Sequence, residues 1–253
     1  MPAALLEANE ILSALTTQAT NDVISLMSVV SQYDRADALA TLTVAYPDLM
    51  QPYLVSADLV GQEFYTRQPG GVPEFAPVAA SAPPDKALGA NARWMYLNPD
   101  PVNASGVITK AVFGMFRESQ VVNTAIEHGY DDPDAMVNRG YETTWARRTQ
   151  GGACGFCQVL QTRDMAYTSA KSALGVVGAR NSRDSVRGRQ PYGAKYHDHC
   201  RCVVIPVRPG ATYEPQHQTA DWTARYEDAI RASQKRYGRF NLDAVARMLE
   251  AAA

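Results

Sequence analysis

The chain has 253 residues, of which 46% are hydrophobic and 20% are charged, and its formal net charge at pH 7 is −2. This length and composition allow one large domain or two small ones around an apolar core. No run of about 18 apolar residues occurs, which excludes a transmembrane helix, and acidic residues near the N-terminus make a secretory signal unexpected.

The small net charge hides an uneven distribution of charged residues. Residues 1–144 carry 7 Lys and Arg against 17 Asp and Glu, residues 145–208 carry 11 against 3, and residues 209–253 carry 6 of each. The basic middle is either a surface for a polyanion or the partner of the chain's own acidic N-terminal part. Both interpretations stay open at this point.

Residues 1–66 are predicted to be helical, because apolar residues recur at helical spacing and line one helix face. This stripe consists of Leu5, Ala8, Leu12, Leu15, Ala19, Val23, Leu26 and Val30. Asp34 is a predicted N-cap of a second helix, and Pro47 is expected near the start of a further one. About 60 residues alone bury little core. We therefore expect a helical hairpin or bundle that packs on a partner.

Residues 69–101 hold seven of the fifteen prolines. Proline lacks a backbone donor and has a fixed φ, so neither a long helix nor a central strand is expected there. The composition predicts an extended connector that lies along other parts of the protein. Trp94 and Tyr96 suggest that part of this connector is docked.

The next predicted elements are helices. "NASGVITKAVFGMFRESQVVNTAIEHGY" predicts a helix with Asn103 or Ser105 as its N-cap and Gly129 at its end. A short helix is predicted from Pro133 through "DDPDAMVNRGYETTWARR", and "QVLQTRDMAYTSAKSAL" is compatible with a third.

The sequence after these helices changes in character. "SALGVVGARNSRDSVRGRQPYGAK" is rich in Gly and Arg and predicts a loop. "CRCVVIPV" predicts a strand that Pro206 stops, and two helices are expected in "TADWTARYEDAIRASQKRY" and "NLDAVARMLEAAA". We expect the basic side chains of the loop to face DNA or an acidic partner. These are Arg180, Arg183, Arg187, Arg189 and Lys195.

The four cysteines form two close pairs that predict a metal site. Cys154-x2-Cys157 has the spacing of a chelating turn, and a second half reads His197-x2-Cys200-x-Cys202. If the predicted strand includes Cys200 and Cys202, their side chains share one face, and either can be the last ligand. A site with four protein ligands indicates structural zinc. The candidate ligands are Cys154, Cys157, His197, Cys200 and Cys202, with His199 as a rival.

Other chemistry of these residues is less well supported. "CGFC" resembles a thioredoxin-type redox motif, but no βαβ pattern precedes it. A papain-like nucleophile needs a different local sequence, and the H-x-E signature of zinc deaminases is absent from the sequence. Two disulfides remain the main alternative to a metal.

The two-part motif resembles a known family. "WARRTQGGACGFCQVLQTRDMAY" followed by "YHDHCRCVVIPV" is similar to the phage Mu F-like head morphogenesis (minor capsid) family, in its actinobacteriophage version. The resemblance covers about residues 104–208. The family often has "HPNCRC" where this chain has "HDHCRC", and the change adds His199.

The resemblance implies a structural virion protein rather than an enzyme. It implies a location inside the phage head at the portal vertex after synthesis in the host cytoplasm, with the portal protein and other head components as partners. Packaged double-stranded DNA is a further expected contact, through Arg180, Arg183, Arg187 and Arg189. The alternative function is a zinc-containing nucleic-acid-binding module.

These observations together predict a mainly α protein with a small α+β metal-stapled module and an extended Pro-rich connector. The expected regions are a helical N-terminal docking region (1–68), the connector (69–103), the zinc-binding module (104–208) and a helical tail (209–253).

Overall fold

The computed structural model describes residues 3–70, 73–131, 143–149, 155–163, 165–174, 200–215 and 219–250. The elements are α1 (Ala3–Val30), α2 (Arg35–Thr66), α3 (Asp85–Leu97), α4 (Pro101–Glu127), β1 (Thr144–Arg148), α6 (Gly155–Gln161), α7 (Ala170–Leu174), β2 (Val203–Val207), α8 (Thr219–Tyr237) and α9 (Leu242–Glu250). The predicted fold class is confirmed, since the protein is mainly helical with a small antiparallel sheet. Among the described residues, no helix combines the length and apolar character that crossing a membrane requires.

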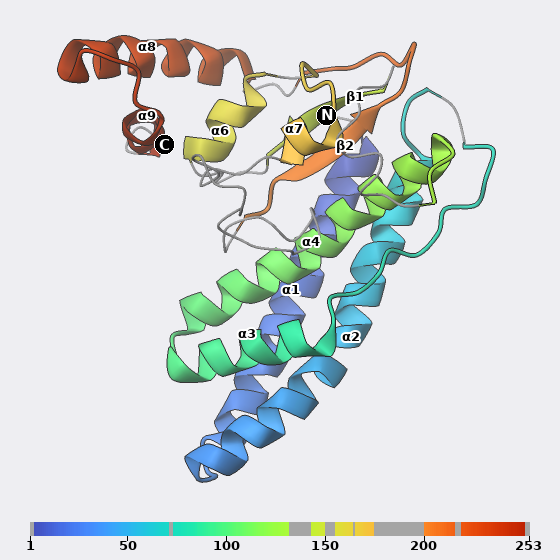
Figure 1. Cartoon of the computed structure of the whole chain (residues 1–253), viewed down its shortest axis with the longest axis vertical. Helices are drawn as coiled ribbons and strands as arrows, with labels where there is room; N and C mark the ends of the chain where they lie inside the picture. The colour runs from blue at the N-terminus through green and yellow to red at the C-terminus, as the bar shows by residue number, and fades with distance from the viewer. Residues whose placement is uncertain are drawn as a thin grey trace.

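The four long N-terminal helices form a bundle. α1 and α2 run in opposite directions, α4 packs against both, and α3 packs against α2 and α4 (Figure 1). The predicted stripe of α1 is confirmed: Leu5, Leu12 and Val23 are completely buried. They belong to a core that also contains side chains of α2, α3, α4 and β2. The stripe therefore finds its partner within the chain, and it no longer supports the prediction that residues 1–66 dock on another protein.

α2 begins where the sequence predicts but continues further. Asp34 is its N-cap and accepts hydrogen bonds from the backbone N–H groups of Asp37 and Ala36, which lower the pKa of the Asp34 carboxyl. The prediction of a new helix near Pro47 is wrong, because α2 runs unbroken through Pro47 and Pro52.

α3 packs closely against the turn of α2 that contains Pro47. Proline cannot donate to the carbonyl four residues earlier, which here belongs to Thr43. Gly89 of α3 lies against that residue: a Cβ added to Gly89 would be 3.5 Å from the Thr43 carbonyl oxygen and 3.3 Å from its Cγ2. The close approach of α3 thus covers the turn that Pro47 weakens.

The connector is extended over residues 73–84 and is fastened to the bundle. The side-chain amide of Asn123 accepts a hydrogen bond from Val78 N at 2.8 Å and donates one to Val78 O at 3.1 Å. The carboxylate of Asp58 accepts a hydrogen bond from Ala80 N at 3.1 Å. Burial raises the pKa of the Asp58 carboxyl. Side chains of the bundle therefore supply the partners that a strand would find in a sheet.

The second half of the predicted connector is instead the helix α3. Its sequence, "DKALGANARWMYL", contains no proline. The prolines that disfavour a helix in this region lie only on either side of α3. The docked side chains match the prediction only in part, since Tyr96 packs against the core and Trp94 does not. Leu88, Ala92 and Met95 are buried, Tyr96 is partly buried, and Trp94 is 42% exposed.

α4 begins two residues before the first predicted cap. Asp100 is its N-cap and accepts a hydrogen bond from Val102 N at 2.8 Å, with Pro101 in the first turn, so neither Asn103 nor Ser105 has that role. The predicted end is confirmed, because Gly129 follows α4 with φ +75.

The middle of α4 buries polar side chains that hold other segments. These residues are Arg117, Ser119, Gln120, Asn123 and Thr124. The amide of Gln120 donates to Gly61 O of α2 at 2.8 Å. A Cβ on Gly61 would lie 2.6 Å from the Cβ of Ser119, so glycine permits the close crossing of α2 and α4.

β1 and β2 pair antiparallel, with Trp145 opposite Pro206 and Ala146 opposite Ile205. The predicted strand β2 is confirmed, although Pro206 lies within it rather than after it. Trp145 N donates to Tyr167 O at 2.8 Å, so it points away from β2. Pro206, opposite Trp145, has no backbone N–H, and none is needed at this position of the ladder.

The helix predicted through "TWARR" is wrong, because these residues form β1. Residues 132–142 of that prediction lie outside the described residues.

The segment after the first cysteine pair forms two short helices, α6 and α7, rather than one. The predicted loop lies outside the described residues from residue 175 onward, as do Arg180, Arg183, Arg187, Arg189 and Lys195.

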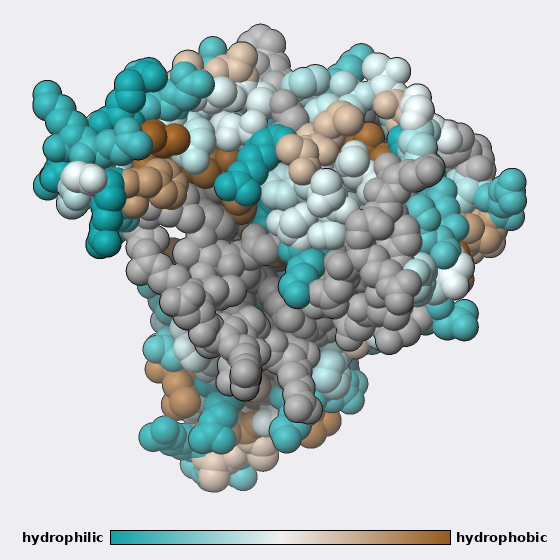
Figure 2. Space-filling view, turned by 45° about the horizontal axis from the view of Figure 1, so that its top comes forward, coloured by the Kyte–Doolittle hydropathy of each residue, from teal (hydrophilic) through white to brown (hydrophobic). Residues whose placement is uncertain are grey.

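The two tail helices are confirmed as α8 and α9. Val159 of α6 forms a small apolar core with Ala229 of α8 and with Val245 and Leu249 of α9. Much of α8 remains exposed, and the surface at its end of the molecule is largely hydrophilic (Figure 2).

Candidate metal centre

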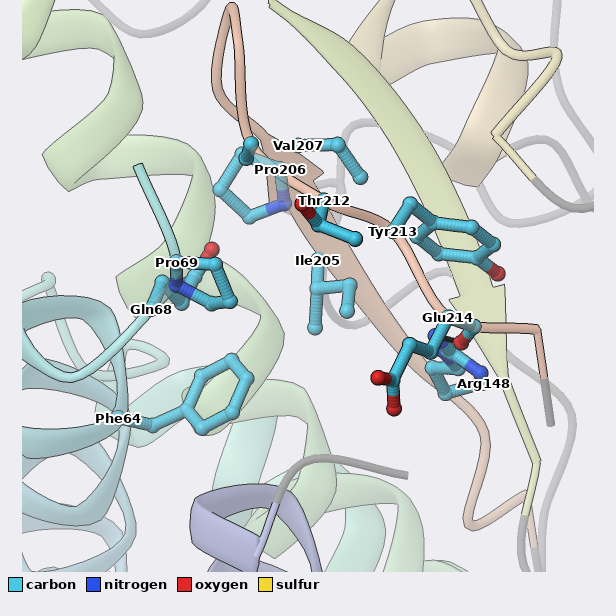
Figure 3. A pocket seen from close by; sticks show the side chains of 11 residues that line it. Phe64, Gln68, Pro69, Arg148, Ile205, Pro206, Val207, Thr212, Tyr213 and Glu214 are labelled. Carbon is cyan, nitrogen blue, oxygen red and sulfur yellow. Dashed lines mark hydrogen bonds between the residues drawn. The ribbon is translucent and has the colours of Figure 1, made fainter. Parts of the chain in front are cut away.

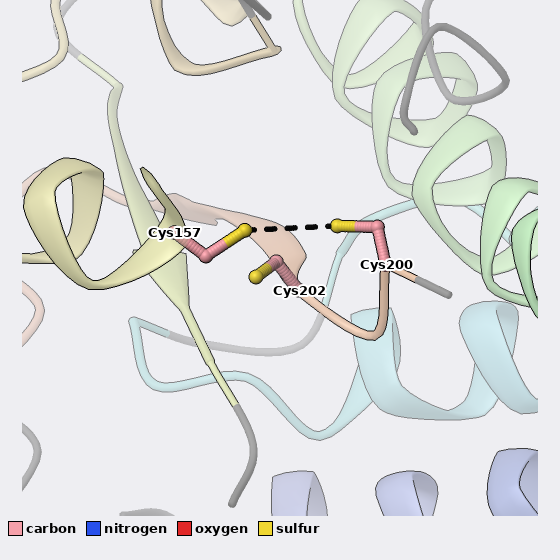
Figure 4. A group of neighbouring side chains, drawn as sticks. All are labelled: Cys157, Cys200 and Cys202. Carbon is pink, nitrogen blue, oxygen red and sulfur yellow. Dashed lines mark hydrogen bonds between the residues drawn. The ribbon is translucent and has the colours of Figure 1, made fainter. Parts of the chain in front are cut away.

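Three of the predicted ligands come together in the structure. Cys157 lies on α6, and Cys200 and Cys202 lie in the segment that leads into β2 (Figure 4). All three are about 2% exposed, and their sulfur atoms lie within 4.8 Å of one another. The other predicted ligands, Cys154 and His197, and the rival His199 lie outside the described residues.

The spacing of the sulfur atoms fits a metal ion better than a disulfide. The Sγ atoms of Cys157 and Cys200 are 3.7 Å apart. A disulfide bond is about 2.05 Å long. Two thiolates bound to one tetrahedral zinc at about 2.3 Å are about 3.8 Å apart. The arrangement can therefore accept a metal ion with little movement of these two side chains.

The prediction that Cys200 and Cys202 begin a strand is not met, because β2 starts at Val203. Their sulfur atoms nevertheless both approach Cys157. The convergence comes from the way the segment is held, not from the alternation of a paired strand.

Burial is the main influence on the pKa of the Cys202 thiol. It raises the pKa of the Cys202 thiol well above its ordinary value; the hydrogen bond from Cys157 and the charge of Arg147 lower it, while Cys200 raises it further. Buried thiolates need a positive charge beside them, and a bound metal ion supplies that charge as the thiols lose their protons. Thiolate ligands favour soft or borderline ions such as zinc and copper(I).

Polar contacts place α6, and hence Cys157, against the rest of the site. Gln161 at the end of α6 is completely buried. Its side-chain oxygen accepts a hydrogen bond from Thr149 N at 2.7 Å, just after β1, and its nitrogen donates to the Thr219 hydroxyl at 3.2 Å, at the start of α8. The hydroxyl of Tyr167 donates to Leu160 O at 2.6 Å.

The second half of the site is held by a residue that the sequence did not predict. Arg117 of α4 is completely buried, and its guanidinium donates to Cys202 O and to Cys200 O, both at 2.7 Å. The available signal was weak: an arginine that directly follows the apolar run "VFGMF".

Part of the basic excess of residues 145–208 points inward. Arg147, Arg148 and Arg208 are all at most 5% exposed. Arg147 donates to Ala173 O, and Arg148 lies over the ring of Tyr213 at 4.3 Å.

Arg208 supports the interpretation that the basic middle pairs with the chain's own acidic N-terminal part. It forms an ion pair with Glu127 of α4 at 2.9 Å. Glu127 belongs to the acidic N-terminal part, so at this residue the basic middle pairs with the chain's own acidic groups. The composition alone could not separate such buried cations from exposed ones.

A small pocket lies between the end of α2, β2 and residues 211–214 (Figure 3). Its wall is mostly apolar and includes Phe64, Ile205 and Tyr213, with Arg148 and Glu214 at one side. Its free volume is about 30 Å³. Ligand sites typically measure about 300–1,000 Å³, so this pocket is a weaker candidate than the thiol cluster.

Comparison with known proteins identifies the family. The sequence profile of the VG15 protein family matches residues 2–229, from α1 into α8. No curated protein and no solved structure matches the chain. The match agrees with the prediction of a phage protein, but the matching family is VG15 and not the Mu F-like family that the motif resembles. The chain belongs to the VG15 protein family, a family of viral proteins.

Proposed function

We propose that this protein is a structural minor capsid protein of a tailed phage, which acts in head assembly and lies inside the head at the portal vertex. The viral family over most of the chain supports this proposal, as does the Mu F-like two-part cysteine motif. The observation that carries it is the buried cluster of three thiols. A metal site enclosed by protein ligands stabilises a fold, whereas a catalytic site keeps a position open for substrate.

The proposed ion is zinc. Cys157, Cys200 and Cys202 are three of its ligands, and Cys154 or His197 supplies the fourth. Zinc has no redox chemistry and takes four thiolate or imidazole ligands in tetrahedral geometry, which suits a structural staple. Binding couples to folding, because the ligands come from segments that lie 43 residues apart in the chain.

The proposed contact with the portal uses the outward side of α2. Val44, Val55 and Leu59 are 67%, 46% and 56% exposed. Their spacing places them on one side of the helix, opposite the core. Exposed apolar side chains on a regular helix favour packing against another protein surface.

Two measurements test this function. Mass spectrometry of purified virions should detect the chain at low copy number, and a reconstruction of the portal vertex should place its helical bundle inside the head. In a co-purification assay with portal oligomers, the double substitution Val55→Asp and Leu59→Asp should abolish binding. Trp94→Asp on α3 is the matched control and should leave binding intact. Absence of the chain from virions would refute the proposal.

The second candidate function is nucleic-acid binding, which the basic composition of residues 145–208 favours. Neutralising Arg180, Arg183, Arg187 and Arg189 should then weaken DNA binding and flatten its salt dependence, by about one unit of slope for each lost phosphate contact. Arg231→Ala with Arg236→Ala, on the exposed side of α8, is the control. DNA affinity that does not depend on salt would exclude this candidate.

A further inference from the structure

We infer that Arg117 is the positioning residue of the metal centre: its guanidinium fixes the backbone at Cys200 and Cys202 so that both sulfur atoms face Cys157. This inference rests on the proposed metal site. It adds to that site a group that binds no metal itself and lies on a different element, α4.

The hydrogen bonds of Arg117 are suited to this role. Its Nε donates to Cys202 O and a terminal nitrogen donates to Cys200 O, each at 2.7 Å. The guanidinium is planar and presents its N–H groups in a fixed fork, so it sets the direction of both carbonyls at once. The direction of a carbonyl fixes the adjoining peptide plane, and this restricts the directions that the neighbouring side chains can take.

This support replaces the hydrogen bonds that a sheet would give. The pairing of β2 with β1 begins at Val203, opposite Arg148, so Cys200 and Cys202 lie beyond the paired residues. Arg117 supplies donors to the carbonyls of both cysteines. The position of the second pair of thiols is therefore set by α4 and not by the sheet.

The place of Arg117 on α4 makes it a firm support. Phe113 and Phe116, in the preceding turn, are completely buried in the core of the bundle. Val121, one turn further on, packs in the cluster that contains the three cysteines. Arg117 therefore lies where α4 passes from one core to the other, and it ties the cysteine segment to the helix.

The charge of Arg117 also suits a thiolate site. Three thiolates and one divalent ion have a net charge of −1, from −3 and +2. A guanidinium remains positive at all physiological pH values, and it lowers the cost of burying that negative charge. Arg147 adds a second buried cation whose charge acts on Cys202.

The test compares two buried arginines in the full-length protein. Arg117→Lys keeps the positive charge but loses the fork. Arg208→Lys is the matched control, because Arg208 is also buried and donates to two backbone carbonyls, Tyr65 O and Gln68 O, away from the thiols. Zinc affinity is measured by competition with a chromophoric chelator, and Co²⁺ is used as a spectroscopic probe of thiolate ligation.

Arg117→Lys should lower zinc affinity by about 10–100-fold, the usual effect of removing a group that orients metal ligands. It should also weaken the thiolate-to-cobalt charge-transfer band, because one cysteine of the pair no longer points at the ion. Arg208→Lys should lower the melting temperature but leave zinc affinity and the cobalt band unchanged.

The outcomes separate this inference from the function on which it rests. If the unaltered protein binds neither zinc nor Co²⁺, the proposed metal site is wrong. If it binds both, and Arg117→Lys leaves affinity and spectrum unchanged, the role of Arg117 is wrong while the metal site stands. Equal loss of affinity in both variants would also overturn the inference, because Arg117 would then have only a general structural role. Circular dichroism checks that each variant keeps its helices.

Discussion

The helical bundle of α1–α4 and the thiol module, here β1, α6, α7, β2 and residues 200–202, are held together by different interactions. The bundle has a continuous apolar core to which all four of its helices contribute, and one side of the module's sheet packs into it through Ala146, Ile205 and Val207. The core of the module includes three thiols and lies beside buried arginines, notably Arg117 and Arg147. Apolar packing alone can stabilise the bundle, whereas we expect the module to need a metal ion to join its segments.

The role of the thiols depends on whether the ion is bound. Without metal, burial keeps Cys202 protonated, since its pKa is raised, and a buried thiol then packs like a small apolar side chain. With metal, the three thiolates bind the ion and thereby link α6 to the segment before β2. The comparison therefore predicts that metal removal affects the two regions very unequally.

Loss of the metal is the largest expected effect. Cys157→Ser, or treatment with a strong chelator, removes binding free energy on the order of 10 kcal/mol from the module. Hydrogen exchange measured by mass spectrometry should show the largest loss of protection in residues 155–163 and 200–202, and a smaller loss in β1 and β2, which also pack on the bundle core. Peptides from α1 and α2 should keep their protection. Equal loss in the bundle and the module would contradict the comparison.

A substitution in the core of the bundle should lower the stability of the bundle and leave zinc affinity unchanged. Leu12 is completely buried, and Leu12→Ala should cost about 2–5 kcal/mol of unfolding free energy through lost packing and a cavity. Leu6 on the same helix is 47% exposed, and Leu6→Ala is expected to change stability by less than about 0.5 kcal/mol. Urea unfolding monitored by helical circular dichroism gives both values. Zinc affinity should be the same in both variants; a drop in Leu12→Ala alone would mean that the two regions are coupled.

A substitution at the crossing of α2 and α4 should cause a smaller loss of stability. Gly61→Ala places a methyl group 2.6 Å from the Cβ of Ser119, and the forced separation should cost about 1–3 kcal/mol. Adding Ser119→Gly removes that contact, so the double variant should recover part of the loss in a double-mutant cycle. If the stability changes of Gly61→Ala and Ser119→Gly are additive, the two helices do not cross as closely as the structure shows.

The smallest expected effect is the pH dependence from Asp58. Burial raises the pKa of this carboxyl in the folded protein above its ordinary value of 3.8. The folded state therefore binds the proton more tightly than the unfolded state, and stability falls as pH rises from the unfolded pKa to the folded one. Asp58→Asn keeps the oxygen that accepts from Ala80 N and removes the titration.

Melting curves of both proteins between about pH 3 and about pH 7 test this sign. The unaltered protein should lose stability relative to Asp58→Asn as pH rises through the lower part of that range. A difference that stays constant with pH, or one that changes in the other direction, would show that burial does not raise this pKa.

Local patterns in the sequence predict much of the bundle. The helical period of α1 and the cap at Asp34 act within a few residues, so the sequence around them is sufficient. Pro47 misled the prediction because α2 continues through it, and no local pattern distinguishes a proline inside a helix from one at its start. β1 was missed because all of Trp145–Arg148 is buried, which removes the alternation that marks a strand.

The thiol module was predictable only in part. The spacing of Cys157, Cys200 and Cys202 predicted their convergence across 43 residues, since chelating pairs imply a common ion. Arg117 could not be predicted, because its contact with Cys202 joins residues 85 positions apart and leaves no local pattern. Buried polar contacts of this kind depend on the tertiary fold.

The metal content of the purified protein tests the central claim most directly. The full chain, purified without added zinc, is analysed by inductively coupled plasma mass spectrometry alongside a thiol count on the unfolded protein. The account predicts about one zinc per chain, released by Cys157→Ser and retained by a serine substitution outside the site such as Ala229→Ser. A chain that contains no metal, with all four cysteines paired as disulfides, would contradict it.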